Sequence, residues 1–180
     1  HLMLTHHSAA TPPTYTLRND KGKVTKTLQD NAALKQKVDG MNLASIEFFQ
    51  FQTQDGVDLN GVMVKPANFD ASKKYPVILF QYSGPGSQQV QDSWYVGNCS
   101  AALLERYMAQ EGFVSVIVDG RGTGGRGAEF EKQTYLKLGQ LESHDQVETA
   151  IYLSKLPWVD AKHIGIWGWS FGGFNTLMSM

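Results

Sequence analysis

The sequence has a single cysteine, Cys99, among 180 residues, so an intramolecular disulfide cannot form. We expect this thiol to be buried filler and not a nucleophile. No apolar run approaches the roughly 20 residues that a membrane-spanning helix needs. The charges nearly balance, with 16 Lys and Arg against 17 Asp and Glu and a formal net charge of -1. A chain without a basic field has no general means of holding nucleic acid, which excludes that class of function.

The first seven residues, His1 to His7, have neither the basic region nor the long apolar stretch of a signal peptide, and the chain does not start with methionine. We therefore expect the sequence to come from a longer polypeptide. Hydrophobic residues make up 42% of it and charged residues 18%, which is typical of a globular chain that buries a core.

Residues 14–28 alternate between apolar and polar side chains around a turn at residues 19–22, which predicts a β-hairpin. Asn31 then stands at the N-cap position of a predicted helix over residues 32–38. The hairpin is too small to form a domain alone. We place a domain boundary near Asn31, so that residues 1–30 end one domain and residues 31–180 belong to the next.

The second region has the pattern of a mixed α/β domain. A turn at Asp55-Gly56 predicts an antiparallel strand pair, and the continuous apolar runs after it predict parallel strands that are covered on both faces. The predicted strands are residues 46–51, 57–64, 77–80, 114–118 and 164–167. Two helices are expected between them, one over residues 103–108 capped by Ser100, the other from Ser143, which has capping-box spacing, to Pro157.

Ser170 lies in the sequence Gly168-Trp169-Ser170-Phe171-Gly172-Gly173, between a predicted strand and a predicted helix. This pattern is typical of the nucleophile elbow of α/β-hydrolases, a sharp turn that strains the serine and requires glycine on either side. In that fold the elbow follows the fifth strand, as it does in the predicted order. We therefore predict an α/β-hydrolase fold with Ser170 as the nucleophile and the amide of Phe171 as an oxyanion donor.

A second oxyanion donor in this fold comes from the loop after the third strand, which is here residues 81–88. Tyr82 is well placed in this loop, and a preorganised donor of this kind stabilises a transition state by about 3 to 4 kcal/mol. A half-buried tyrosine at a strand end is the structural alternative. The residues alone leave both interpretations of Tyr82 open.

Three segments of the sequence resemble the prolyl oligopeptidase family of serine peptidases, in its dipeptidyl peptidase IV branch. These segments are Tyr82 to Gln88, Asp119 to Gly122 and Gly168 to Gly173. The similarity runs from about Tyr15 to Met180. Because that family carries a β-propeller before its hydrolase domain, the resemblance implies that residues 1–30 are the end of a propeller. It also implies a chain without a cofactor, peptide substrates, a homodimer, and a periplasmic, secreted or membrane-anchored location.

The implied activity is that of a serine exopeptidase that releases N-terminal dipeptides, X-Pro or X-Ala, through an acyl-enzyme on Ser170. Tyr82 would supply the oxyanion hydroxyl, while Phe171 and Trp169 would contact the substrate. The family usually has tyrosine where this sequence has Phe171, so the apolar wall is kept and a hydroxyl is lost. Tripeptidyl or acylaminoacyl peptidases and esterases share the fold and are the alternatives, as is a non-catalytic module.

The catalytic Asp and His of this fold follow the nucleophile in chain order, and the sequence ends ten residues after Ser170. We therefore expect residues 1–180 alone to be inactive. His163 precedes the elbow strand by a distance of roughly 20 Å along an extended chain, so it cannot act as the base. His144 is expected on a surface helix, and His1, His6 and His7 belong to the N-terminal region.

Residues 120–125 fit the GxGxxG pattern of a dinucleotide site, with Glu142 or Asp145 about twenty residues on. That fingerprint belongs in the first strand-to-helix turn and opens directly into a helix. Here it follows the fourth predicted strand and continues into a charged loop. We therefore expect an arginine-bearing loop near the mouth of the active site in place of a nucleotide site.

Overall fold

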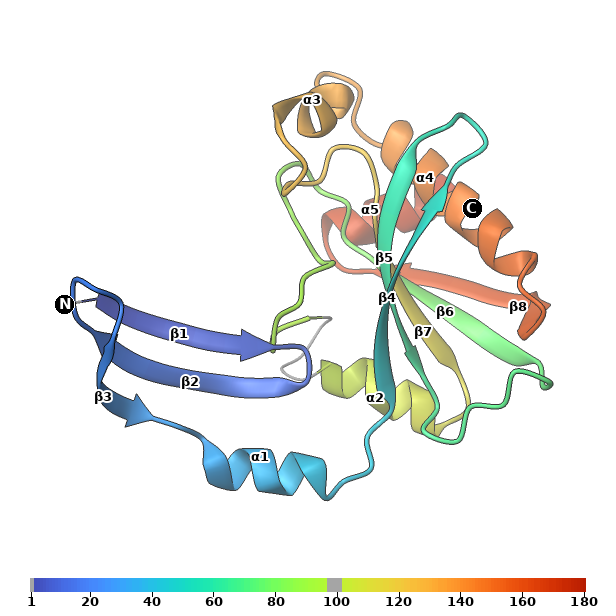
Figure 1. Cartoon of the computed structure of the whole chain (residues 1–180). Coiled ribbons are helices and arrows are strands. Elements are labelled where there is room, and N and C mark those ends of the chain that lie inside the picture. The colour runs from blue at the N-terminus through green and yellow to red at the C-terminus, as the bar shows by residue number, and fades with distance from the viewer. Residues whose placement is uncertain (1, 97–101) are drawn as a thin grey trace. The chain divides into compact units, whose positions relative to one another are not determined.

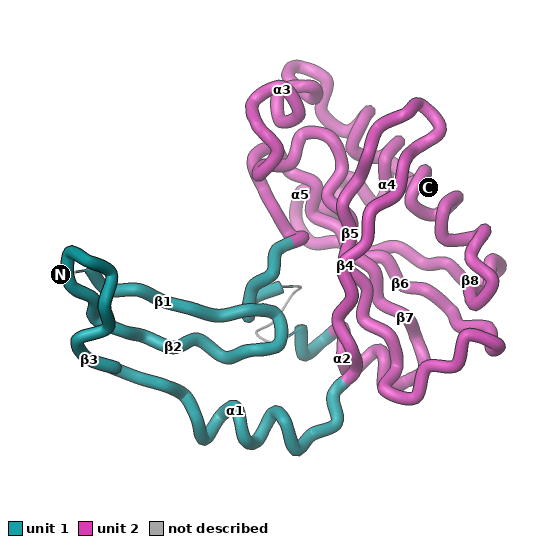
Figure 2. The backbone as a smooth tube through the Cα atoms, in the orientation of Figure 1, with its two compact units in different colours: residues 1–43, 91–104 teal, residues 44–90, 105–180 magenta. Residues whose placement is uncertain are grey.

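The computed structural model describes residues 2–96 and 102–180, so Cys99 and the expected cap Ser100 lie outside the described residues. The chain forms two compact units, shown in Figure 2: unit 1 comprises residues 1–43 and 91–104, and unit 2 comprises residues 44–90 and 105–180. The division after Leu43 comes later than Asn31, where the sequence placed the domain boundary. In the described part of the chain, no helix is long and apolar enough to cross a bilayer.

Unit 1 contains an antiparallel sheet in the order β1-β2-β3, followed by one helix. The elements are β1 (Leu2–Ser8), β2 (Thr11–Arg18), β3 (Val24–Gln29) and α1 (Ala32–Asp39). Strands β2 and β3 confirm the predicted hairpin, whereas β1 was not predicted, because its mostly exposed residues owe their order to pairing with β2. Asn31 does not cap α1 as predicted. Its side chain donates to the carbonyl of Pro13 at 2.6 Å, and Asp30 accepts the Ala32 amide instead.

Unit 2 is built on a five-stranded mixed sheet in the order β4-β5-β7-β6-β8 (Figure 1). Its strands are β4 (Ser45–Gln52), β5 (Asp58–Lys65), β6 (Tyr75–Gln81), β7 (Val114–Asp119) and β8 (Val159–Gly168). Strand β5 pairs antiparallel with both β4 and β7, while β6 pairs parallel with both β7 and β8. These pairings confirm the predicted antiparallel start and the parallel strands after it.

Helix α2 (Leu103–Gln110) begins in unit 1 and ends in unit 2, and unit 2 also contains α3 (Ala128–Glu131), the short 3-10 helix η2 (Lys132–Thr134), α4 (Leu141–Ser154) and α5 (Phe171–Ser179). The capping box predicted at Ser143 is wrong, because α4 begins two residues earlier. Ser143 instead donates its hydroxyl to the carbonyl of Gly139 at 2.6 Å, and the Glu142 carboxylate accepts the Gly139 amide at 2.9 Å. Glu142 therefore binds the backbone just before the helix, and no side chain caps the N-terminus of α4.

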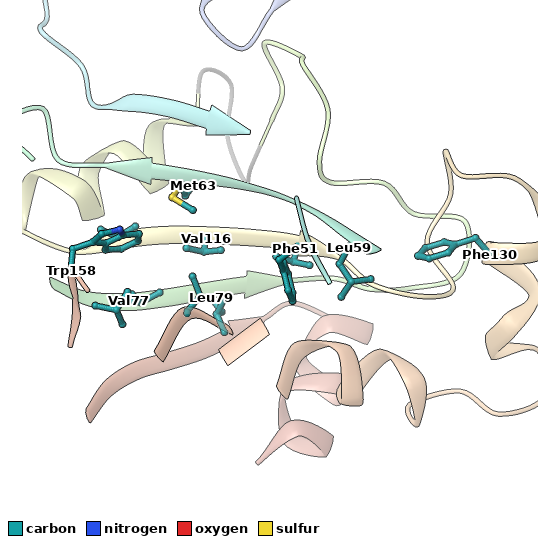
Figure 3. Packing of buried hydrophobic residues seen from close by; sticks show 12 residues of the cluster. Phe51, Leu59, Met63, Val77, Leu79, Val116, Phe130 and Trp158 are labelled. Atoms are coloured by element: carbon teal, nitrogen blue, oxygen red, sulfur yellow. The ribbon is translucent and has the colours of Figure 1, made fainter. Parts of the chain in front are cut away.

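The core of unit 2 lies along the central strands, as Figure 3 shows for Val77, Leu79, Val116 and Leu59. Strand β7 is buried along its whole length, as the apolar run predicted. Strand β8 is one of the two outermost strands of this sheet, and much of it is exposed or half-buried, contrary to the expectation that it is covered on both faces. In the parallel register Gln81 pairs with Gly168, so the loops after β6 and β8 leave the sheet on the same side, at the carboxyl ends of the strands. We call this side the carboxyl edge of the sheet.

Candidate active site

Ser170 stands between the end of β8 and the start of α5, in a conformation that side-chain-bearing residues rarely adopt. Its φ is 54° and its ψ is -117°, and the residue is exposed. Such strain persists only where the surrounding structure imposes it, and it is typical of functional sites. The strand-to-helix turn predicted from the sequence is therefore present and presents the Ser170 side chain at the carboxyl edge of the sheet.

The glycines on either side of Ser170 leave no room for a side chain. A Cβ on Gly168 would lie 2.5 Å from the carbonyl oxygen of Gln81, and a Cβ on Gly172 would lie 2.2 Å from the same atom. Both distances are far below van der Waals contact. The carbonyl at the end of β6 thus touches the elbow on both flanks, which is why the crossing chain requires glycine at these two positions.

Tyr82 opens the loop that follows β6, at the carboxyl edge of the sheet, as does Ser170 after β8. Its ring is half-buried, and its centroid lies 6.5 Å from the centroid of the Phe171 ring. A Cβ on Gly84 would meet this ring at 2.7 Å, so the loop folds closely over Tyr82. The tyrosine therefore faces the elbow and not the opposite edge of the sheet.

Phe171 is the first residue of α5, and its amide is one of the helix N-terminal donors without an intrahelical partner. Its ring is half-buried between the rings of Tyr82 and Phe174, the second of which lies 5.5 Å away between centroids. Trp169 precedes the serine and is 77% exposed. Trp169 and Phe171 thus flank Ser170 in sequence, and the ring of Phe171 lies beside that of Tyr82.

None of the described histidines contacts Ser170. His163 lies in the middle of β8, with its Nδ1 2.8 Å from a carboxylate oxygen of Asp160. His144 lies on α4 with its Nδ1 3.0 Å from a guanidinium nitrogen of Arg121, and His6 and His7 lie on β1 in unit 1. No histidine among residues 2–96 and 102–180 is therefore placed to take the proton of Ser170. The same part of the chain holds no cluster of metal-binding side chains.

The glycine-rich loop after β7 holds a buried ion pair. The guanidinium of Arg121 donates to the Asp145 carboxylate, with the shortest bond at 2.6 Å, and to Asp55 at 2.8 Å. These hydrogen bonds, chiefly those to Asp145, raise the pKa of Arg121. Asp145 is fully buried and also accepts the Arg121 amide, so it is not free to bind a ribose. Within the glycine-rich loop the side chain of Arg121 is thus buried in unit 2, whereas Arg126 is exposed.

A buried carboxylate anchors the far end of the loop that begins at Tyr82. Asp119, the last residue of β7, accepts the amide of Gln89 at 3.0 Å and that of Val90 at 2.8 Å. Burial raises the pKa of Asp119 to about 6, although the two amides act in the opposite direction. Sequence reasoning assigned no role to this carboxylate beyond its place in a motif, because its partners lie some thirty residues earlier in the chain.

Comparisons with known proteins agree with this geometry. Residues 101–180 match the sequence model described as the prolyl oligopeptidase family. The solved structure of Porphyromonas gingivalis dipeptidyl peptidase 4 superposes with a TM-score of 0.90 at 46% identity, over 97% of this chain and 24% of that one. The chain belongs to the prolyl oligopeptidase family. Within that family it is similar to members of the dipeptidyl peptidase IV branch.

Two fungal members of the family have similar sequences. The dipeptidyl peptidase 4 of Arthroderma otae is 39% identical over 161 residues, which cover 89% of this chain and 20% of the relative. The enzyme of that name from Trichophyton equinum is 38% identical over 164 residues, with coverage of 89% and 20%. The chain thus spans about a fifth of the length of the curated relatives it matches. The resemblance predicted from the three motifs is confirmed.

Proposed function

We propose that the protein carrying these residues is a serine exopeptidase that releases N-terminal dipeptides, with proline or alanine before the scissile bond. The observation that carries the proposal is Ser170 in its strained turn, at the carboxyl edge of the sheet, which it shares with Tyr82 and Phe171. Relatives named dipeptidyl peptidase favour this activity over the tripeptidyl, acylaminoacyl and esterase alternatives.

In the proposed reaction Ser170 Oγ attacks the carbonyl carbon of the scissile bond and loses its proton to a general base. The carbonyl oxygen becomes an oxyanion that accepts hydrogen bonds from the Phe171 amide and the Tyr82 hydroxyl. Collapse of this intermediate expels the shortened peptide as an amine, and water then hydrolyses the acyl-enzyme. The base is not a described histidine, and in this fold it follows the nucleophile in chain order.

We further propose that residues 1–30 end a β-propeller and that residues 31–180 are the first part of an α/β-hydrolase domain. The strand order of unit 2, with the elbow after its fifth strand, supports the hydrolase assignment. The small antiparallel sheet of unit 1 is compatible with part of a propeller blade. Peptide substrates, a homodimer and a location outside the cytoplasm follow from the family resemblance and belong to the same proposal.

The test is turnover of chromogenic substrates by the full-length protein and by its Ser170→Ala variant. We expect X-Pro and X-Ala dipeptide substrates to be cleaved, and tripeptide, N-acylated and simple ester substrates to be poor. The Ser170→Ala variant should lose all cleavage and all labelling by a phosphonate. Full activity in that variant would show that the nucleophile lies elsewhere.

A further inference from the structure

A fully buried glutamine lies between the two segments of the candidate site, which are the loop that begins at Tyr82 and the start of α5. Gln81 is the last residue of β6, directly before Tyr82, and it is 0% exposed. A buried amide is costly unless its donors and acceptors are paired, so the partners of this side chain indicate what it does. All of these partners lie either in the loop that begins at Tyr82 or in the helix that begins at Phe171.

The side-chain amide of Gln81 uses all four of its hydrogen-bonding positions. Its Nε2 donates to the Gly172 carbonyl and to the Thr176 hydroxyl, each at 3.2 Å. Its Oε1 accepts from Asn175 Nδ2 at 2.6 Å and from the Ser83 hydroxyl at 2.9 Å. One side chain therefore ties the start of the Tyr82 loop to the first two turns of α5.

These partners bracket the two proposed oxyanion donors. Tyr82 lies between Gln81 and Ser83, and Ser83 has a φ of 57°, a conformation that costs energy in a residue with a side chain. The hydroxyl of Ser83 is held by Gln81 and by the amide of Gln146 at 3.2 Å, which keeps the loop in this conformation. On the other side, Gly172 directly follows Phe171 and is bound by the same glutamine.

We propose that Gln81 is the positioning residue of the oxyanion site: its amide sets the spacing between the Tyr82 hydroxyl and the Phe171 amide. The inference rests on the proposed function and adds a residue that touches neither substrate nor nucleophile. An oxyanion donor acts only when it points at the developing charge. A small displacement of the donor therefore reduces the stabilisation of the transition state and leaves substrate binding nearly unchanged.

Two threonines provide a matched pair of variants for the test in the full-length protein. Thr176 and Thr149 each donate a hydroxyl to the carbonyl four residues earlier, on α5 and α4 respectively, but only Thr176 also accepts from Gln81. We expect Thr176→Val to lower kcat about 3- to 10-fold, with KM changed less than about 2-fold. Thr149→Val should leave both constants within about 2-fold, even if both variants unfold at a lower temperature.

A double-mutant cycle shows whether Gln81 acts through the oxyanion site. We expect Gln81→Met to lower kcat about 10- to 100-fold in the parent, but only about 3-fold in a protein that already carries Tyr82→Phe. If Gln81→Met does not fold, Thr176→Val in the two backgrounds decides the question in the same way. Additive effects, equal losses in the two threonine variants, or a change confined to KM would each overturn the inference. Activity that survives Ser170→Ala would instead defeat the proposed function itself.

Discussion

Truncation of Phe171 separates the two roles proposed for this residue, because its amide belongs to the elbow and its ring to the pocket wall. Phe171→Ala keeps the helical backbone and the amide that we propose as an oxyanion donor. It removes a half-buried ring that packs between Tyr82 and Phe174, at centroid distances of 6.5 and 5.5 Å. The wall that would contact the residue before the scissile bond is then absent.

Apolar pocket contacts of this size contribute about 1 to 3 kcal/mol to discrimination between substrates. We therefore expect the ratio of kcat/KM for proline over lysine substrates to fall about 5- to 150-fold in Phe171→Ala. The ratio for proline over alanine should fall less, because both side chains are small and apolar. The assay compares X-Pro, X-Ala and X-Lys chromogenic dipeptides in the parent and in the variant.

The matched control is Phe174→Ala, the same truncation one turn further along α5, where the ring touches Phe171 but does not form the proposed wall. Labelling of Ser170 by a small phosphonate should continue in both variants, because the amide and the nucleophile are untouched. An unchanged ratio in Phe171→Ala, or an equal change in Phe174→Ala, would refute the assignment of the wall to Phe171.

Three further predictions concern the framework and the oxyanion site. Asp145→Ala leaves the buried guanidinium of Arg121 without its main partner, and urea titration should show a loss of about 3 to 5 kcal/mol in the free energy of unfolding; a loss below about 1 kcal/mol would contradict this. Since the folded state holds the proton of Asp119 more tightly than the unfolded state does, the stability from this group is full below about pH 4 and is lost as pH rises through about 6. Between pH 4 and pH 7 the free energy of unfolding should therefore decrease by up to about 3 kcal/mol more in the parent than in Asp119→Asn. An equal decrease in both proteins would show that Asp119 does not cause the pH dependence. Tyr82→Phe should lower kcat about 100- to 1000-fold at nearly constant KM, and an unaltered kcat would exclude the hydroxyl from the reaction.

Much of the fold could be predicted because its signals lie between neighbouring residues. The turn at Asp55-Gly56, the apolar runs of β6 and β7, and the glycines around Ser170 each constrain the backbone where they stand. The order of these signals along the chain was enough to predict that Ser170 follows the fifth strand of the hydrolase region. The sequence also pointed to Tyr82 and Phe171, since the loops that carry them follow parallel strands.

What the sequence could not determine is which polar groups are buried and what they pair with. Ser143 had the spacing of a cap, yet its hydroxyl donates to the carbonyl of Gly139, and the side chain of Asn31 donates to the carbonyl of Pro13 on β2. Nothing in the local sequence indicated that Arg121 pairs with Asp145, which lies 24 residues further along the chain.

Gln81 shows the reason most clearly, because its partners on α5 lie more than ninety residues further along the chain. A buried amide takes whatever donors and acceptors the tertiary structure places around it, and no local pattern records them. The sequence by itself determined where the chain turns to present Ser170. Only the tertiary structure, which brings the end of β6 to α5, decided that Gln81 joins the Tyr82 loop to the helix after Ser170.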